Sequence, residues 1–113
     1  MDITKEIKNN VGILKIFGDT SIHIERKLNE LVKSVGPKTQ YRFILDLSQC
    51  AYIDSGAIGS IILTNKLISD MNGKFCICGV QDENVDKLFN STKLYNLIPK
   101  FENVEEAFEN FFS

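Results

Sequence analysis

The run Phe43-Ile-Leu-Asp-Leu-Ser48, followed shortly by Ala51-Tyr-Ile-Asp-Ser-Gly-Ala-Ile-Gly59, decides the fold. The first run is short and apolar, which is typical of a strand covered on both faces. The second leads into apolar residues at helical spacing and predicts an amphipathic helix. Ser55 is expected at or near the N-cap of this helix, with Asp54 just before it. Together the two runs predict one strand-loop-helix unit of an α/β fold.

The sequence on either side of this unit predicts the remaining elements from periodicity and turn residues. Gly18 is expected to break a strand, and Gly36-Pro37 to end a helix. Asn72-Gly73 ends the next helix, with Gly73 suited to a left-handed conformation. Asn103, with Glu106 three residues later, predicts the start of a terminal helix. Strands are therefore expected over 3–7, 11–17, 41–47, 74–78 and 95–98, with Cys50 in a loop, and helices over 24–35, 58–68, 85–89 and 104–111.

This order, β-β-α-β-α-β-α-β-α, predicts a single α/β domain spanning residues 1–113. Strands that alternate with helices favour parallel neighbours joined by right-handed crossovers. The first two strands form a hairpin. We therefore expect a mixed, mostly parallel sheet of four to five strands, with an antiparallel first strand and about four helices.

Composition restricts the function. The net charge is −2, from 13 basic and 15 acidic residues, which argues against binding to nucleic acid. Three cysteines cannot all pair within the chain, and Cys76 and Cys78 are placed to pack on one face of a strand. This cysteine usage fits a reducing compartment. No run is long enough to span a membrane, so we expect a cytoplasmic protein.

Ser55 admits two interpretations. A serine at this place usually caps the helix, which stabilises it by about 1 kcal/mol. Capping does not explain Gly56 and Gly59, which are expected in the first turn, where each glycine costs up to ~1 kcal/mol relative to alanine. Glycine is favoured where another surface approaches the backbone closely. The two glycines therefore favour a docking surface.

The run Tyr52-Ile-Asp-Ser-Gly-Ala-Ile-Gly59 resembles the signature of STAS domains, in particular of the bacterial anti-sigma factor antagonists. Their pattern at this place is an apolar pair followed by Asp-Ser-Ser/Thr-Gly-Leu-Gly. Phe43–Ser48 resembles the strand before the signature, Gly18-Asp19 resembles the Gly-acidic pair that ends the second strand, and Val85-Asp-Lys-Leu-Phe89 resembles a helix after the fourth strand. The likeness extends over nearly the whole chain.

The resemblance implies a function. Ser55 corresponds to the serine that a cognate kinase phosphorylates. In the family, the unphosphorylated protein binds an anti-sigma factor that is also a serine kinase. Phosphorylation breaks this complex, and a serine phosphatase of the PP2C type restores it. The partner-binding residues implied are Asp54, Gly56, Ala57, Gly59, Asp19 and Ser21.

The chain also departs from the family pattern. Gly56 stands where a second Ser or Thr is usual, Ala57 stands where Gly is usual, and Thr20-Ser21 replaces a Leu-Asp pair whose aspartate often helps meet the kinase. Some STAS domains are never phosphorylated. The alternative function is therefore a STAS scaffold or ligand-binding module within a larger regulatory or transport complex.

Other chemistries fit the sequence poorly, and we expect neither an enzyme nor a cofactor or metal. His23 is the single histidine, so a histidine-based metal site or a Ser-His-Asp triad would depend on it alone. The Gly-x-Ser-x-Gly pattern is missing around Ser55. A receiver domain would place its phosphorylated aspartate at Asp46, but it also needs an acidic pair after its first strand. Phosphate-binding glycine-rich loops are absent from the sequence.

Overall fold

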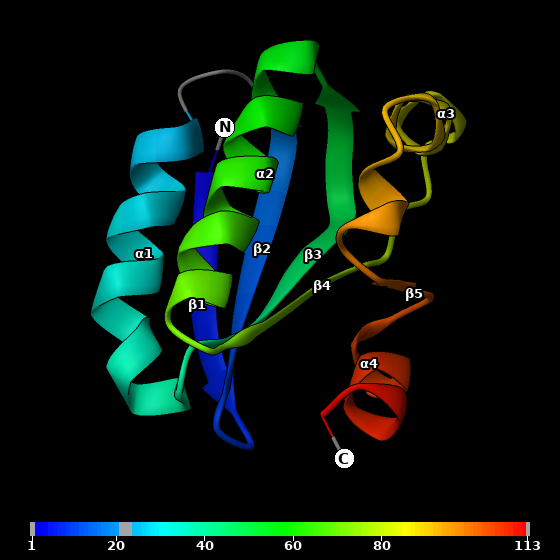
Figure 1. The fold of residues 1–113 in the computed structure, drawn as a ribbon. Coiled ribbons are helices and arrows are strands. Elements are labelled where there is room, and N and C mark those ends of the chain that lie inside the picture. Colours follow the sequence, from blue (N-terminus) through cyan, green and yellow to red (C-terminus); the bar gives the residue numbers. More distant parts are fainter. Residues whose placement is uncertain (1, 21–23, 113) are drawn as a thin grey trace.

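A computed structural model describes residues 2–20 and 24–112. Within this part of the chain, one sheet has the strand order β1-β2-β3-β4-β5; β1 is antiparallel to β2, and the other pairs are parallel. Four α-helices and a short 3-10 helix complete the fold (Figure 1). The predicted α/β class, with a mixed and mostly parallel sheet, is confirmed. The elements are β1 (Asp2–Lys8), β2 (Val11–Thr20), α1 (Ile24–Thr39), β3 (Arg42–Ile53), α2 (Ser55–Asp70), β4 (Lys74–Cys78), α3 (Glu83–Ser91), η1 (Leu94–Asn96), β5 (Lys100–Phe101) and α4 (Val104–Asn110).

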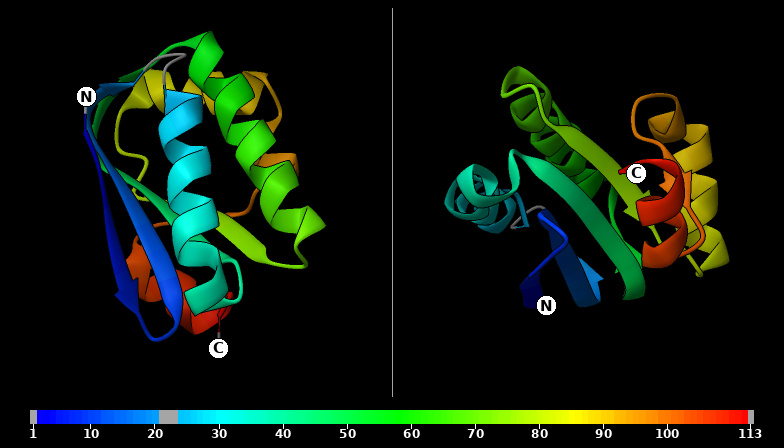
Figure 2. Two further views of the ribbon diagram at one scale, coloured as in Figure 1. Left: turned by 90° about the vertical axis from the view of Figure 1, so that its left-hand side faces the viewer. Right: turned by 90° about the horizontal axis from the view of Figure 1, so that it is seen from below.

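The sheet separates two layers of core. Phe43 and Leu45 of β3 face the larger core, which α1, α2 and α3 cover with residues such as Leu28, Ile61 and Phe89. α1 and α2 lie side by side on this face (Figure 2). Alternate residues point to the opposite face, where α4 covers a smaller core that contains Ile44, Cys76, Cys78 and Ala107. β3 is therefore covered on both faces along its first half, as its apolar run predicts.

β3 extends further than predicted, through Cys50 to Ile53. Gly18 does not end β2, which continues to Thr20 and pairs Gly18 with Cys50 and Thr20 with Ile53. The register shifts between Lys15 and Phe17 and again between Gly18 and Asp19, and Gly18 adopts φ +78°, a conformation open to glycine at a β-bulge. The strand prediction failed here because a bulge interrupts the alternation of apolar residues. Cys50 consequently lies buried in a strand and not in a loop.

One predicted helix end is wrong, and a second is confirmed with a different residue in the left-handed conformation. α1 continues past Gly36-Pro37 to Thr39, and Gly36 is needed because a Cβ there would collide with the Tyr41 ring. After α2, Asn72 takes the left-handed conformation, with φ +59°, and Gly73 does not. A Cβ on Gly73 would collide with the carbonyl oxygen of Tyr41. Both glycines therefore serve close packing against the turn that enters β3.

Near the C-terminus, the strand predicted over 95–98 is wrong. η1 occupies Leu94–Asn96, with Leu94 and Ile98 buried, and the last strand is β5, which pairs with Ile77 and Cys78. The predicted terminal helix is confirmed as α4. Its N-cap, Asn103, accepts a hydrogen bond from the amide of Glu106 at 2.8 Å. Cys76 and Cys78 pack in the core as predicted, and burial raises the pKa of the Cys76 thiol to about 12.

Asp46 is a buried carboxylate within β3. Its side chain is 7% exposed and lies 3.7 Å from the ammonium of Lys15. The carboxylate also accepts a hydrogen bond from the amide of Ser48 at 2.9 Å, next to the register shift in β3. These two partners satisfy a charge that would otherwise be costly to bury.

Replacing Asp46 with alanine should lower the free energy of unfolding by about 1–3 kcal/mol, because it leaves the part-buried amide of Ser48 without its acceptor. Asp70→Ala is the matched control. It removes an exposed pair with Lys66 at 3.3 Å and should cost less than about 1 kcal/mol. Urea denaturation measures both values. Equal losses in the two variants would contradict this account of Asp46.

Candidate functional site

The candidate site lies where β3 passes directly into α2. β3 ends at the buried Ile53, and α2 begins two residues later at Ser55. Asp54 is the N-cap, in extended conformation, and its Oδ1 accepts a hydrogen bond from the amide of Ala57 at 2.8 Å. Ser55 lies next to the N-cap, as expected, but the interpretation that it caps the helix itself is wrong. Asp54 provides the capping oxygen, and Ser55 is the first residue of the helix.

Capping by Asp54 leaves the Ser55 side chain available. Ser55 is exposed, and its hydroxyl makes no hydrogen bond with any residue in the described ranges 2–20 and 24–112. The side chains that follow fix the helix beneath it, because Ala57 and Ile58 are buried in the larger core. Ser55 is thus an accessible hydroxyl on a well-anchored first turn.

The other predicted partner-binding residues are divided between surface and core. Gly56 is half-buried. Gly59 is exposed and lies on the second turn of α2, whereas the sequence predicted it on the first turn. A Cβ on Gly59 would meet nothing within 4 Å, so packing within the chain does not require a glycine there. Ala57 is buried, so its side chain supports the helix from below. Asp19 pairs with Tyr52 through the backbone, which brings the end of β2 beside the site, whereas Ser21 lies outside the described residues.

A groove of about 430 Å³ opens between the start of α2 and α3. In Figure 1 the start of α2 and α3 lie on either side of the end of β3, in the upper part of the molecule. Tyr52, which is 55% exposed, contributes to the groove together with Ser55. The full lining is Ala51, Tyr52, Ile53, Asp54, Ser55, Asp82, Asn84, Val85 and Leu88.

The sequence did not predict that residues of α3 form one wall of this groove. Its residues lie about thirty positions from Ser55, and only the crossover after β4 brings them close. Asp82 caps α3 and accepts hydrogen bonds from the amides of Asn84 and Val85 at 2.9 and 3.0 Å. An aspartate before an apolar helical pattern is a capping signal, so the start of α3 could have been predicted.

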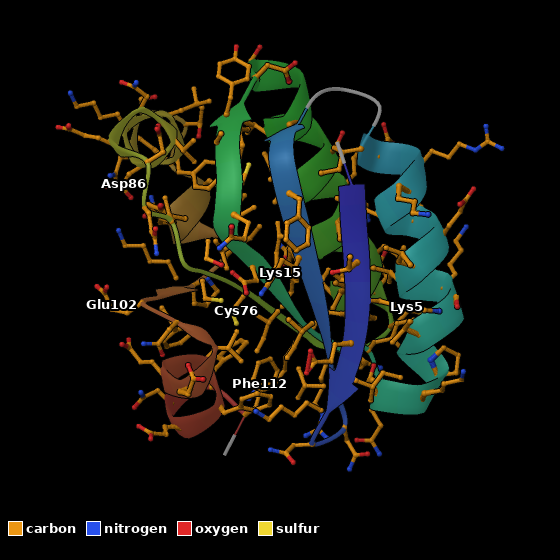
Figure 3. The ribbon with its side chains drawn as sticks, turned by 180° about the vertical axis from the view of Figure 1, so that it is seen from behind. Lys5, Lys15, Cys76, Asp86, Glu102 and Phe112 are labelled. Carbon is orange, nitrogen blue, oxygen red and sulfur yellow. The ribbon has the colours of Figure 1, made fainter. Side chains whose placement is uncertain are left out.

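A polar cluster holds α3 in place. The Tyr95 hydroxyl donates to Asp86 Oδ1 at 2.7 Å, and the Lys100 ammonium lies 3.1 Å from the same oxygen. The hydrogen bond from Tyr95 and the nearby Lys100 hold the pKa of Asp86 below its usual value. Figure 3 labels Asp86 on α3. This cluster links α3 to η1 and β5 and so fixes one wall of the groove.

The chemistry of the site is that of an accessible alcohol. Among residues 2–20 and 24–112, no group of three or more His, Cys, Asp or Glu side chains is placed to hold a metal ion. The Asp54 carboxylate already accepts a hydrogen bond from the helix.

In the same described ranges, no helix has the length and hydropathy needed to cross a membrane.

The capping assignment predicts unequal effects of two neighbouring substitutions. Asp54→Ala should lower the free energy of unfolding by about 0.5–2 kcal/mol, because the Ala57 amide loses its side-chain acceptor. Ser55→Ala should change it by less than about 0.5 kcal/mol, because its exposed hydroxyl makes no hydrogen bond to any residue that the structure describes. Denaturant unfolding of both variants tests this. A larger loss for Ser55→Ala would restore Ser55 as the cap.

Comparison with known proteins places this arrangement in a family. The family model of the STAS domain matches residues 2–107. A candidate anti-sigma factor antagonist from Thermotoga maritima is 24% identical, with a TM-score of 0.80 over 98% of this chain and 95% of that chain. The phosphorylated form of the Bacillus cell fate determinant SpoIIAA is 15% identical, with a TM-score of 0.68 over 96% and 97%.

A sulfate transporter family protein from Wolinella succinogenes is 16% identical, with a TM-score of 0.76 over 91% of this chain and 85% of that chain. At these identities, the structural matches establish the shared fold, while the family model covers nearly the whole chain. The five-stranded sheet, the β3–α2 junction and this match lead to one conclusion: the chain belongs to the STAS domain family.

Proposed function

We propose that this STAS domain is a phospho-switched anti-sigma factor antagonist with Ser55 as its phosphorylated residue. In its unphosphorylated form it binds an anti-sigma factor that is also a serine kinase. Phosphorylation of Ser55 releases that partner, and a PP2C-type phosphatase reverses the modification. The protein performs no covalent chemistry itself, because Ser55 is a substrate.

The observation that carries this proposal is the exposed Ser55, which lines the α2–α3 groove and whose hydroxyl makes no hydrogen bond within the described part of the chain. A kinase can reach such a hydroxyl without unfolding the helix. Phosphate would add a charge of about −1.5 to −2 at the N-terminus of α2, where the helix macrodipole favours a negative group. The fold should therefore tolerate the modification.

The added negative charge would instead weaken the binding of a partner packed against the site. Asp54 and Asp82 both line the groove, so a phosphate on Ser55 would join two existing carboxylates. A protein surface docked there would have to remove water from this concentrated negative charge. Desolvation of an unpaired charge is costly, and like charges across an interface cost several kcal/mol. Phosphorylation would thus weaken the complex while leaving the domain folded.

The comparisons support this proposal in part. SpoIIAA, which shares the fold, is known in a phosphorylated form. The similarity to a sulfate transporter family protein supports the alternative, in which the domain is an unphosphorylated scaffold or ligand-binding module of a larger complex. The replacements at Gly56 and Ala57 also favour this alternative. The two functions differ in whether Ser55 accepts phosphate.

Incubation with candidate anti-sigma factor kinases and ATP tests the phosphorylation. We expect a mass increase of one phosphate on the wild-type protein and none on Ser55→Ala. Peptide mapping should place the phosphate on residue 55. An unmodified wild-type protein with every candidate kinase would favour the scaffold function, and phosphate on another residue would contradict the assignment of Ser55.

A charge substitution tests the binding part of the proposal. Ser55→Asp should weaken binding to the anti-sigma factor by at least about tenfold, because it adds a carboxylate beside Asp54 and Asp82. Ser34→Asp adds the same charge to an exposed position of α1 outside the groove and should leave the affinity unchanged. Calorimetric titration gives both affinities. Unchanged binding of Ser55→Asp would argue against the switch.

A further inference from the structure

Asp54 holds the first turn of α2 with two oxygens. Its carboxylate Oδ1 and its backbone carbonyl oxygen both accept from the amide of Ala57, at 2.8 and 3.1 Å. No loop separates the strand from the helix, since Ile53 is the last residue of β3 and Ser55 the first of α2. The backbone is therefore still extended at Asp54, which has φ −92° and ψ 171°, and is helical from the next residue on.

The residues on both sides of this junction are fixed. Ile53 is buried on the strand side, and Ala57 and Ile58 are buried on the helix side. Ser55 lies between these anchors and is exposed. The position of its hydroxyl is therefore set by the helical geometry of the first turn, which the Asp54–Ala57 hydrogen bond maintains. Phosphoryl transfer is sensitive to the placement of the attacking oxygen, because it is catalysed mainly by positioning.

The geometry assigns Asp54 the role of a positioning residue for phosphorylation of Ser55, through its hydrogen bond to the helix and not through its charge. This inference rests on the proposed function of Ser55. It reassigns Asp54, which the family resemblance places among the partner-binding residues. A carboxylate that recognised the kinase would act through its negative charge, whereas a capping residue acts through an acceptor oxygen that a neutral side chain can also provide.

The charge of Asp54 would in fact oppose the reaction. The phosphoryl group passes from ATP to the Ser55 oxygen, with ADP as the leaving group and the hydroxyl proton passing to a base of the kinase, and its negative charge arrives beside the Asp54 carboxylate. Asn and Ser provide an N-cap acceptor nearly as well as Asp does, whereas Ala provides none. The side chain at position 54 can therefore be changed so that charge and hydrogen bond are lost separately.

Kinetics with the kinase that modifies the wild-type protein test this inference. Asp54→Ala should lower kcat for phosphorylation by about tenfold or more, since a displaced reacting group typically costs up to about 100-fold. Asp54→Asn and Asp54→Ser should restore the rate to within about threefold of wild type. Asn103→Ala is the matched control, because it removes the equivalent cap of α4, far along the chain from Ser55, and should leave the rate unchanged.

Hydrogen exchange provides a second readout that needs no partner. The Ala57 amide should exchange faster in Asp54→Ala than in wild type, and at a near wild-type rate in Asp54→Asn, because only the first loses the side-chain acceptor at 2.8 Å and keeps the longer backbone bond at 3.1 Å alone.

The possible failures are distinguishable. If Asp54→Asn is phosphorylated as slowly as Asp54→Ala while its Ala57 amide remains protected, the charge is what matters and the positioning role is overturned. If Asn103→Ala slows phosphorylation equally, the effect is one of general stability, and the role is again overturned. If no kinase modifies the wild-type protein at all, the proposed function itself fails, and the role assigned to Asp54 fails with it.

Discussion

The hydrogen bond between the Asp54 carboxylate and the Ala57 amide is the interaction on which the site depends. It joins β3, whose first half is buried on both faces and whose last residue Ile53 is buried, to a helix buried along one side, with no intervening loop. A junction this short leaves Ser55 little freedom except to face outward. The buried residues on both sides of Ser55 therefore determine the position of its hydroxyl, although Ser55 itself is exposed.

This arrangement separates stability from regulation. The groups that hold the junction together are Asp54 and the buried Ala57 and Ile58, while Ser55 lies beside them without a hydrogen bond among the described residues. A modification of Ser55 can then change the surface while the hydrogen bond between Asp54 and Ala57 that caps α2 is retained. The α3 wall, fixed by Asp86 and Tyr95, makes that surface a groove and not a flat patch. Both walls begin with an aspartate cap, so added negative charge has its largest effect there.

Much of this could be predicted from sequence, for reasons that particular residues make clear. The apolar run of β3 and the periodicity of α1 and α2 predict the α/β class, because burial imposes those patterns directly. The boundaries of strands and helices were mispredicted where a single glycine has a structural role that the neighbouring sequence does not indicate. Gly18 extends a strand through a bulge, and Gly36 and Gly73 make room for Tyr41. The site was found through Ser55, but the α3 wall could not be predicted, because it depends on how distant segments pack. The exchange of capping roles between Ser55 and Asp54 is a shift of one residue, which sequence patterns rarely resolve.

Amide spectra of the domain before and after phosphorylation provide the most direct test of the central claim, that Ser55 is an exposed hydroxyl whose modification alters a surface and not the fold. We predict that chemical shift changes are confined to residues 51–59 and to the α3 wall over 82–88. The amides of β4 and α4 should keep their positions and their protection from exchange. Changes that spread through β4 and α4, or a loss of spectral dispersion on phosphorylation, would contradict it.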